Sequence, residues 1–170
     1  AHGAACALAG LSHPAVAVRR ASLKALPKAD ILAARSIIEN LVLDPVKDLR
    51  RAAGDALLTV RHEGLTPLLE QLLARPDLDD AERKWVYFAL GRLGGQKPAA
   101  ILLKEFAASR EQDVRCSCAL ALGTCGDPSA RPALQAVAGK FFGPKELKEA
   151  CREALQRLQS RGEPAKGAGR

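Results

Sequence analysis

The sequence has no methionine, and aromatic residues make up only 4% of its 170 residues. With so few large rings, the apolar 48% is carried mainly by alanine and leucine, which suit close packing between helices. The missing methionine leads us to expect a processed product or a piece of a longer protein. No apolar run approaches the ~20 residues of a membrane-spanning helix, and we find no secretory signal. We therefore expect no membrane partner.

Common catalytic motifs are also missing. The sequence has no GxSxG, P-loop or HExxH motif and no paired cysteine–histidine constellation. His62-Glu63 is the one His–Glu pair, and we interpret it as the polar start of a helix. Because no catalytic or ligand set is apparent, we predict that the chain is not an enzyme and has no cofactor and no metal site.

The five cysteines are an odd number, and none forms a CxxC pair. Cys116 and Cys118 lie two residues apart on a predicted helix, so they point to roughly opposite sides and cannot share a metal. Cys118, Cys125 and Cys151 fall on predicted core faces. This pattern favours buried, reduced thiols in a cytoplasmic protein.

What the sequence does contain is a repeat. A basic residue recurs at intervals of 31, 33, 32 and 33 residues, at Arg19, Arg50, Arg83, Arg115 and Lys148. Each is followed seven residues later by leucine, and alanine always precedes that leucine. The residue three positions after each basic residue is small or branched. A period of this length predicts a helical solenoid.

The segments SHPAVAVRRASLKAL, LDPVKDLRRAAGDALL, DVRCSCALALGTCGDP and KELKEACREALQRL resemble HEAT repeats, most closely the short variety shared with phycobilisome-lyase-like proteins. The resemblance covers about residues 5–158. It implies an all-α fold, a right-handed α-solenoid of about five helical hairpins over residues 1–159. The expected units are about 2–28, 29–60, 61–95, 96–126 and 127–159, followed by a flexible tail or linker at 160–170.

The third unit departs from this pattern, because Glu82 stands in place of Val or Leu and Trp85 in place of a small residue. We expect the helix spacing to be altered there. From apolar periodicity and turn residues, the helices are predicted at 2–10, 15–26, 30–42, 46–60, 64–74, 79–93, 98–108, 112–125, 129–139 and 144–159.

A helical wheel identifies the outward face of each second helix. Counting from the basic residue, positions +1 and +5 lie opposite the core and +4 lies on the flank. In HEAT-like solenoids the second helices line the concave groove, so these positions predict partner-binding residues at Arg20, Lys24, Arg51, Lys84, Tyr87, Phe88, Cys116 and Leu120. The basic column is predicted to be structural, with stems packed between repeats and head groups paired with carboxylates or carbonyls.

Three enzyme classes share this kind of repeat. HEAT-repeat metal hydroxylases use several His–Glu pairs to hold a di-iron centre, and the single pair here cannot supply that set. Alkylpurine glycosylases with HEAT-like repeats need an aromatic and acidic pocket, for which Trp85 with Asp55 is the only candidate; we expect Trp85 to be interior. Nothing identifies a chromophore site of a phycobilin lyase.

The leading hypothesis is therefore a non-catalytic scaffold or adaptor that binds a protein partner in its concave groove. The aromatic residues would anchor the partner, and the basic ones would steer an acidic segment. The net charge of +7 leaves nucleic-acid binding through the same basic stripe as an alternative. A lyase-like enzyme subunit is a weaker alternative.

Overall fold

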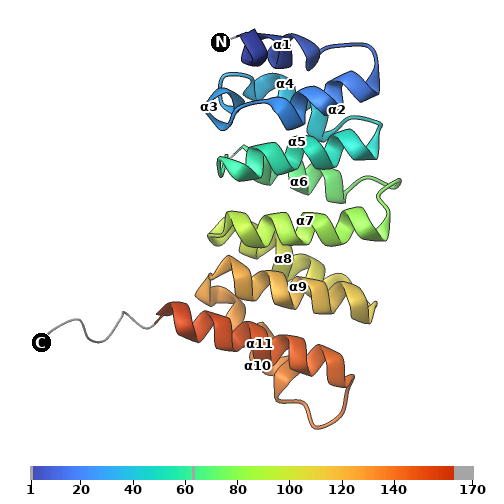
Figure 1. Ribbon diagram of the computed structural model, residues 1–170. Coiled ribbons are helices and arrows are strands. Elements are labelled where there is room, and N and C mark those ends of the chain that lie inside the picture. The colour runs from blue at the N-terminus through green and yellow to red at the C-terminus, as the bar shows by residue number, and fades with distance from the viewer. Residues whose placement is uncertain (1, 63, 163–170) are drawn as a thin grey trace, which may run out of the picture. The chain divides into compact units, whose positions relative to one another are not determined.

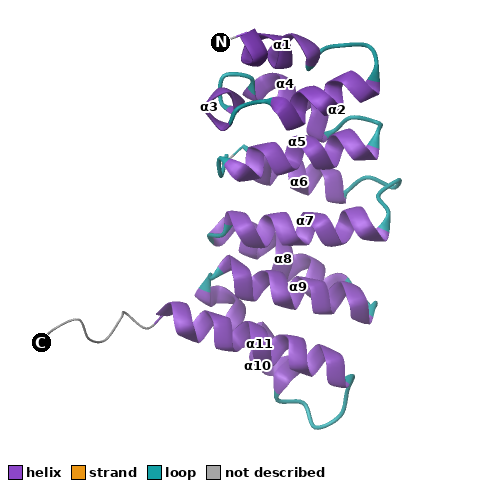
Figure 2. Ribbon diagram, viewed as in Figure 1, coloured by secondary structure: helices purple, strands orange, loops and turns teal. Residues whose placement is uncertain are grey.

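The computed structural model describes residues 2–62 and 64–162, and every regular element in them is a helix (Figure 2). The predicted all-α fold is confirmed. The chain divides into two compact units, residues 1–89 and 90–170. The boundary falls inside one helix, α7.

The first unit consists of helical hairpins in chain order (Figure 1). Its helices are α1 (His2–Gly10), α2 (Val16–Ala25), α3 (Lys28–Ile31), α4 (Arg35–Val42), α5 (Lys47–Thr59), α6 (Leu65–Leu73) and most of α7 (Asp80–Leu93). The second helices α2 and α5 pack side by side, and α4 packs on α5. Apolar side chains from these helices form the core, among them the fully buried Ile38, Leu49 and Leu57.

The second unit repeats the arrangement with α8 (Gln96–Ala108), α9 (Gln112–Cys125), the short 3-10 helix η1 (Pro128–Ala130), α10 (Arg131–Ala138) and α11 (Lys145–Gly162). Helix α9 packs on both α8 and α11. The approach of α9 to α11 is close, since a Cβ atom on Gly123 would lie 2.6 Å from the Cα atom of Ala154. Cys118, Cys125 and Cys151 are buried as predicted, and all five cysteines are free.

The helix boundaries agree with the sequence pattern in most places, with two differences. The predicted helix 30–42 is interrupted, because Ala34 (φ −93°, ψ 8°) leaves the helical region between α3 and α4. Helix α11 continues to Gly162, past the predicted end at 159. The rest of the predicted tail, residues 163–170, lies outside the described residues.

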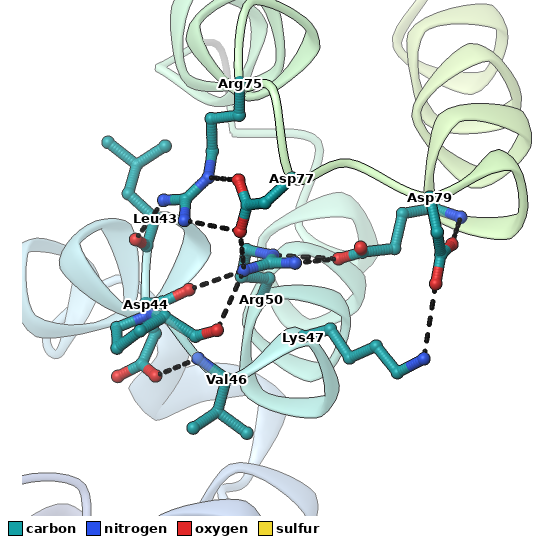
Figure 3. Close-up of polar contacts among 10 residues, drawn as sticks. Leu43, Asp44, Val46, Lys47, Arg50, Arg75, Asp77 and Asp79 are labelled. Atoms are coloured by element: carbon teal, nitrogen blue, oxygen red, sulfur yellow. Dashed lines mark hydrogen bonds and ion pairs between the residues drawn. The ribbon is translucent and has the colours of Figure 1, made fainter.

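Three residues of the basic column fasten the loop of their own hairpin. The guanidinium group of Arg19 donates to the carbonyl oxygens of His13 and Pro14, each at 2.9 Å. Arg50 donates to the carbonyls of Asp44 and Pro45 at 3.0 Å (Figure 3). Lys148 reaches the carbonyl of Phe141 at 3.4 Å. The structural role predicted for these three residues is confirmed.

The unusual residues of the third repeat fit into this scheme. Arg50 Nη2 lies 2.6 Å from Oε1 of Glu82, and its Nη1 lies 3.6 Å from Asp77. In Figure 3, Arg75 donates hydrogen bonds to both carboxylate oxygens of Asp77 and a further one to the carbonyl oxygen of Leu43. The hydrogen bond from Arg75 lowers the pKa of the Asp77 carboxyl below its ordinary value. Glu82, which stands where the repeat pattern has Val or Leu, therefore pairs with Arg50 of the preceding repeat.

Candidate functional site

A surface pocket of about 540 Å³ lies over the paired helices α2 and α5 in the first unit. Its rim carries four cations and two carboxylates, and its floor is apolar. The lining residues are Arg20, Leu23, Lys24, Leu26, Lys28, Ile31, Asp48, Arg51, Ala52, Asp55, Ala56 and Thr59. A pocket with this composition suits a ligand that carries both anionic and apolar groups.

Both carboxylates of the pocket are already engaged. Asp48 accepts a hydrogen bond from Arg20 at 3.1 Å, and Asp55 accepts one from Nε1 of Trp85 at 2.9 Å. The other three cations, Lys24, Lys28 and Arg51, make no ion pair among the described residues; their side chains are exposed. The pocket therefore presents an excess of positive charge to solvent.

The floor of the pocket comes from the core side of the same helices. Leu23, Leu26 and Ile31 are buried, with exposed fractions below one tenth. The sequence places them there because α2 carries apolar residues on the face that packs against α5, and α3 adds one more turn after Pro27. An apolar side chain of a ligand could cover this floor while its acidic groups meet the cations on the rim.

A smaller cavity of about 200 Å³ adjoins this pocket and shares Asp48 and Arg51 with it. Its wall includes Lys47 and Asp79, whose side chains pair at 3.2 Å (Figure 3). The backbone N–H of Glu82 donates to Asp79, and this bond, with the one from Lys47, lowers the pKa of the carboxyl. The hollowed surface thus extends from α2 across α5 toward the start of α7, but in this second cavity Lys47 and Arg50 are paired with Asp79 and Glu82.

The structure assembles only part of the predicted groove in one place. Arg20, Lys24 and Arg51 line the pocket together. Lys84 and Phe88 are exposed on α7 in the same unit, whereas Cys116 and Leu120 are partly buried on α9 in the second unit. Joint binding by these seven residues stays a prediction.

Tyr87 is a correction to the predicted groove. Only 1% of its surface is exposed, so it cannot act as a surface anchor. In the first four repeats the flanking +4 position is buried, as Leu23 and Ala119 also show, whereas Arg152 in the last repeat is exposed. Gly54 is so close to Trp85 of the next repeat that a Cβ atom would lie 2.3 Å from the ring. The helical wheel places this position away from its own hairpin core, but it does not account for the adjacent repeat.

Three charged residues of the pocket were not among the predicted site residues. Lys28 belongs to the one-turn helix α3, which the sequence pattern merged with the following helix. Asp48 lies on α5 one turn before the predicted Arg51, and Asp55 occupies the outward +5 position of the same helix but was not included among the predicted binding residues. Inspecting every charged residue of α2, α5 and the segment after Pro27 in the sequence would have found all three.

His62 and Trp85 are occupied by structural contacts. The imidazole Nε2 of His62 lies 2.6 Å from Oε1 of Glu39 on α4, while Glu63 lies outside the described residues. Trp85 is buried, as predicted, and its indole N–H is satisfied by Asp55. In the part of the chain that the structure describes, no three His, Cys, Asp or Glu side chains form a group that could hold a metal ion.

The sequence matches the family model for HEAT repeats over residues 65–156, more than half of the chain. The chain belongs to the HEAT-repeat family. A search of the curated proteins gave no match. The closer resemblance to phycobilisome-lyase-like repeats is therefore not confirmed.

Among solved structures, the chain is similar to human deoxyhypusine hydroxylase in complex with glycerol, with a TM-score of 0.59 and 26% sequence identity. The match covers 84% of this chain and 49% of that chain, so it spans about half of the hydroxylase. Our prediction that the chain is not an enzyme is wrong by this comparison, because a similar HEAT-repeat structure belongs to an enzyme. The error was to treat the absence of familiar motifs as the absence of catalysis.

Proposed function

We propose that this HEAT-repeat chain binds an acidic segment of a protein partner in the pocket over α2 and α5. The observation that carries the proposal is the set of three cations, Lys24, Lys28 and Arg51, without an ion pair in the described structure, above an apolar floor. Cations at the rim would steer an acidic chain and set its register. Apolar side chains of the partner would then cover Leu23, Leu26 and Ile31.

The proposal is tested by titrating the chain with a labelled peptide in which Asp and Glu alternate with Leu, and measuring fluorescence anisotropy. The double substitution Lys24→Glu with Arg51→Glu should weaken binding about tenfold or more, equivalent to about 1.4 kcal/mol or above. Both side chains are exposed, so the fold should survive. The matched control, Lys104→Glu with Arg152→Glu, makes the same charge change at exposed positions of the second unit and should bind normally.

Equal loss of binding in both double variants would show that net charge, not the pocket, attracts the peptide. A duplex DNA titration in parallel examines the nucleic-acid alternative. Tight DNA binding with a steep loss of affinity as salt rises, abolished by Lys24→Glu with Arg51→Glu, would replace the peptide proposal.

A second candidate is a catalytic role, supported by the structural similarity to deoxyhypusine hydroxylase. Binding in the pocket and chemistry on the bound segment are compatible. The described residues supply no metal-binding group, so we assign no catalytic step to them. Mass spectrometry of the bound peptide after incubation with the chain, air and a reductant tests this candidate: a gain of one oxygen atom would support it, and an unchanged mass would count against it.

A further inference from the structure

Two phenylalanines project from the loop between α10 and α11 in the second unit. Phe141 is 88% exposed and Phe142 is 83% exposed, more than any other large apolar side chain in the described structure. Their rings contact each other edge to face, with centroids 5.0 Å apart. Together they form a small apolar tip. We call this tip, with its flanking Lys140 and Lys145, the Phe-Phe loop.

The backbone of this loop is anchored by a hydrogen bond, whereas its two phenylalanine rings are exposed to solvent. Lys148 donates to the carbonyl of Phe141, in the same way that Arg19 and Arg50 fasten their own loops. Gly143 takes φ +131°, a conformation that favours glycine, and Pro144 leads into α11. The phenylalanine rings are therefore displayed on an anchored turn.

The repeat itself does not require these rings. The corresponding loops inside the other four hairpins lie at residues 11–15, 43–46, 74–79 and 109–111, and none contains an aromatic residue. They carry proline, aspartate, arginine and serine instead, as solvent-facing turns usually do. An exposed pair of phenylalanines is thus an addition to this hairpin with no part in packing it.

The charged residues next to the tip favour one kind of binding surface over others. Lys140 and Lys145 flank the rings, and no carboxylate lies between residues 139 and 145. Of the nearest acids in sequence, Glu146 accepts a hydrogen bond from Gln112 at 2.8 Å, and Glu149 lies 3.7 Å from Lys145 itself in an exposed pair. Lys140 makes no ion pair in the described structure, and Lys145 would exchange Glu149 for a lipid phosphate on docking. Aromatic rings between lysines match the boundary of an anionic bilayer, where rings enter the acyl region and ammonium groups meet lipid phosphates.

We propose that the Phe-Phe loop docks the protein on an anionic lipid surface, with Phe141 and Phe142 inserted at the interface and Lys140 and Lys145 on the headgroups. Such docking needs both an apolar and a cationic element, because either alone gives weak attachment. It needs no spanning segment, whose absence led us to expect no membrane partner; none of the helices in the described residues is long and apolar enough to cross a membrane.

The test is sedimentation of the full chain with vesicles of phosphatidylcholine alone and of phosphatidylcholine mixed with phosphatidylserine. The protein should partition onto the anionic vesicles and much less onto the neutral ones. The variant Phe141→Ser with Phe142→Ser should lose about tenfold or more of this partitioning, since each ring contributes through burial. Lys140→Glu with Lys145→Glu should remove the preference for anionic vesicles.

The matched control is Leu32→Ser with Ile37→Ser, which removes two exposed apolar side chains from the first unit and should bind vesicles normally. A second control, Lys24→Glu with Arg51→Glu, separates this proposal from the peptide pocket. If that variant loses vesicle binding while the phenylalanine variant keeps it, the lipid proposal is overturned. It is also overturned if the wild-type chain ignores anionic vesicles, or if light scattering shows a dimer that the phenylalanine variant alone abolishes.

Discussion

Arg50 and Glu82 form the most enclosed ion pair in the described structure: Nη2 of the arginine lies 2.6 Å from Oε1 of the glutamate, and only 3% of the arginine side chain is exposed. The two residues lie 32 positions apart, one repeat length. The same guanidinium group also binds the loop carbonyls of its own hairpin. Arg50 therefore links the loop of its own hairpin to the first turn of α7 in the next repeat.

Glu82→Gln should destabilise the protein by about 2–4 kcal/mol, because it leaves a buried guanidinium group with only the exposed and more distant Asp77, at 3.6 Å, as a charged partner. The carbonyls that Arg50 also binds keep the loss from being larger. Urea unfolding followed by circular dichroism measures the change. Asp48→Asn, which breaks the exposed pair with Arg20, is the control and should cost no more than about 1 kcal/mol. Equal effects of the two substitutions would mean that burial does not distinguish these pairs.

Gly123→Ala should lower stability by about 1–3 kcal/mol through overpacking. A Cβ atom there would lie 2.6 Å from the backbone Cα atom of Ala154, and a backbone contact cannot be relieved by a side-chain rotation. Thermal melting records the effect as a lower Tm. Gly3→Ala in α1 provides the comparison, since no atom lies within 4 Å of its Cβ position, and its stability should stay the same or rise slightly. A normal Tm for Gly123→Ala would show that α9 and α11 separate easily.

Tyr87→Ala should cost about 3–5 kcal/mol, as expected for the loss of a large buried ring. Phe88 is its neighbour in sequence and is 52% exposed, so Phe88→Ala should cost less than about 1 kcal/mol. Comparing the two urea midpoints tests the corrected helix face. A larger loss of stability for Phe88→Ala than for Tyr87→Ala would mean that Phe88, and not Tyr87, faces the core.

Cys151 should make stability fall in alkaline solution. Burial, with a smaller contribution from Cys116, raises the pKa of its thiol from the ordinary 9.0 to about 11. Between these values the unfolded chain loses the proton and the folded chain keeps it, so rising pH favours unfolding by up to about 2–3 kcal/mol. Chemical unfolding between pH 8 and about 11 measures the decline. Cys151→Ala should flatten this part of the profile; the same decline in the variant would assign the effect to other groups.

The rate at which each cysteine reacts with a thiol reagent should follow how deeply it is buried. Cys6 is exposed, whereas Cys118, Cys125 and Cys151 are buried, so a thiol reagent at neutral pH should modify Cys6 first and these three slowly. Cys116 should fall between them, because desolvation and the nearby Asp113 and Glu146 raise its pKa. Peptide mass spectrometry after brief labelling gives the order. Rapid labelling of Cys151 in the folded protein would contradict its place in the core.

Local sequence was sufficient for the helices, the repeat and most of the core. Apolar residues at helical spacing and the prolines and glycines at turns define most of the helix boundaries, because these signals act within one or two turns of the chain. The role of the basic column was also readable, since Arg19 and Arg50 bind carbonyls only five and six residues away. The three core cysteines follow from the same periodicity.

Tertiary structure decided what depends on a neighbouring repeat. Tyr87 is buried and Glu82 finds Arg50 because packing between repeats adds contacts that a single-helix wheel does not contain. The pocket likewise depends on which side chains already have partners: Asp48 is paired with Arg20, and Asp55 accepts a hydrogen bond from Trp85. Lys24, Lys28 and Arg51 face solvent without an ion pair in the described structure, so the pocket keeps an excess of positive charge. The sequence alone determined the repeating helices, because their signals are local, whereas the charge and burial of the candidate site depended on pairings between residues about one repeat apart.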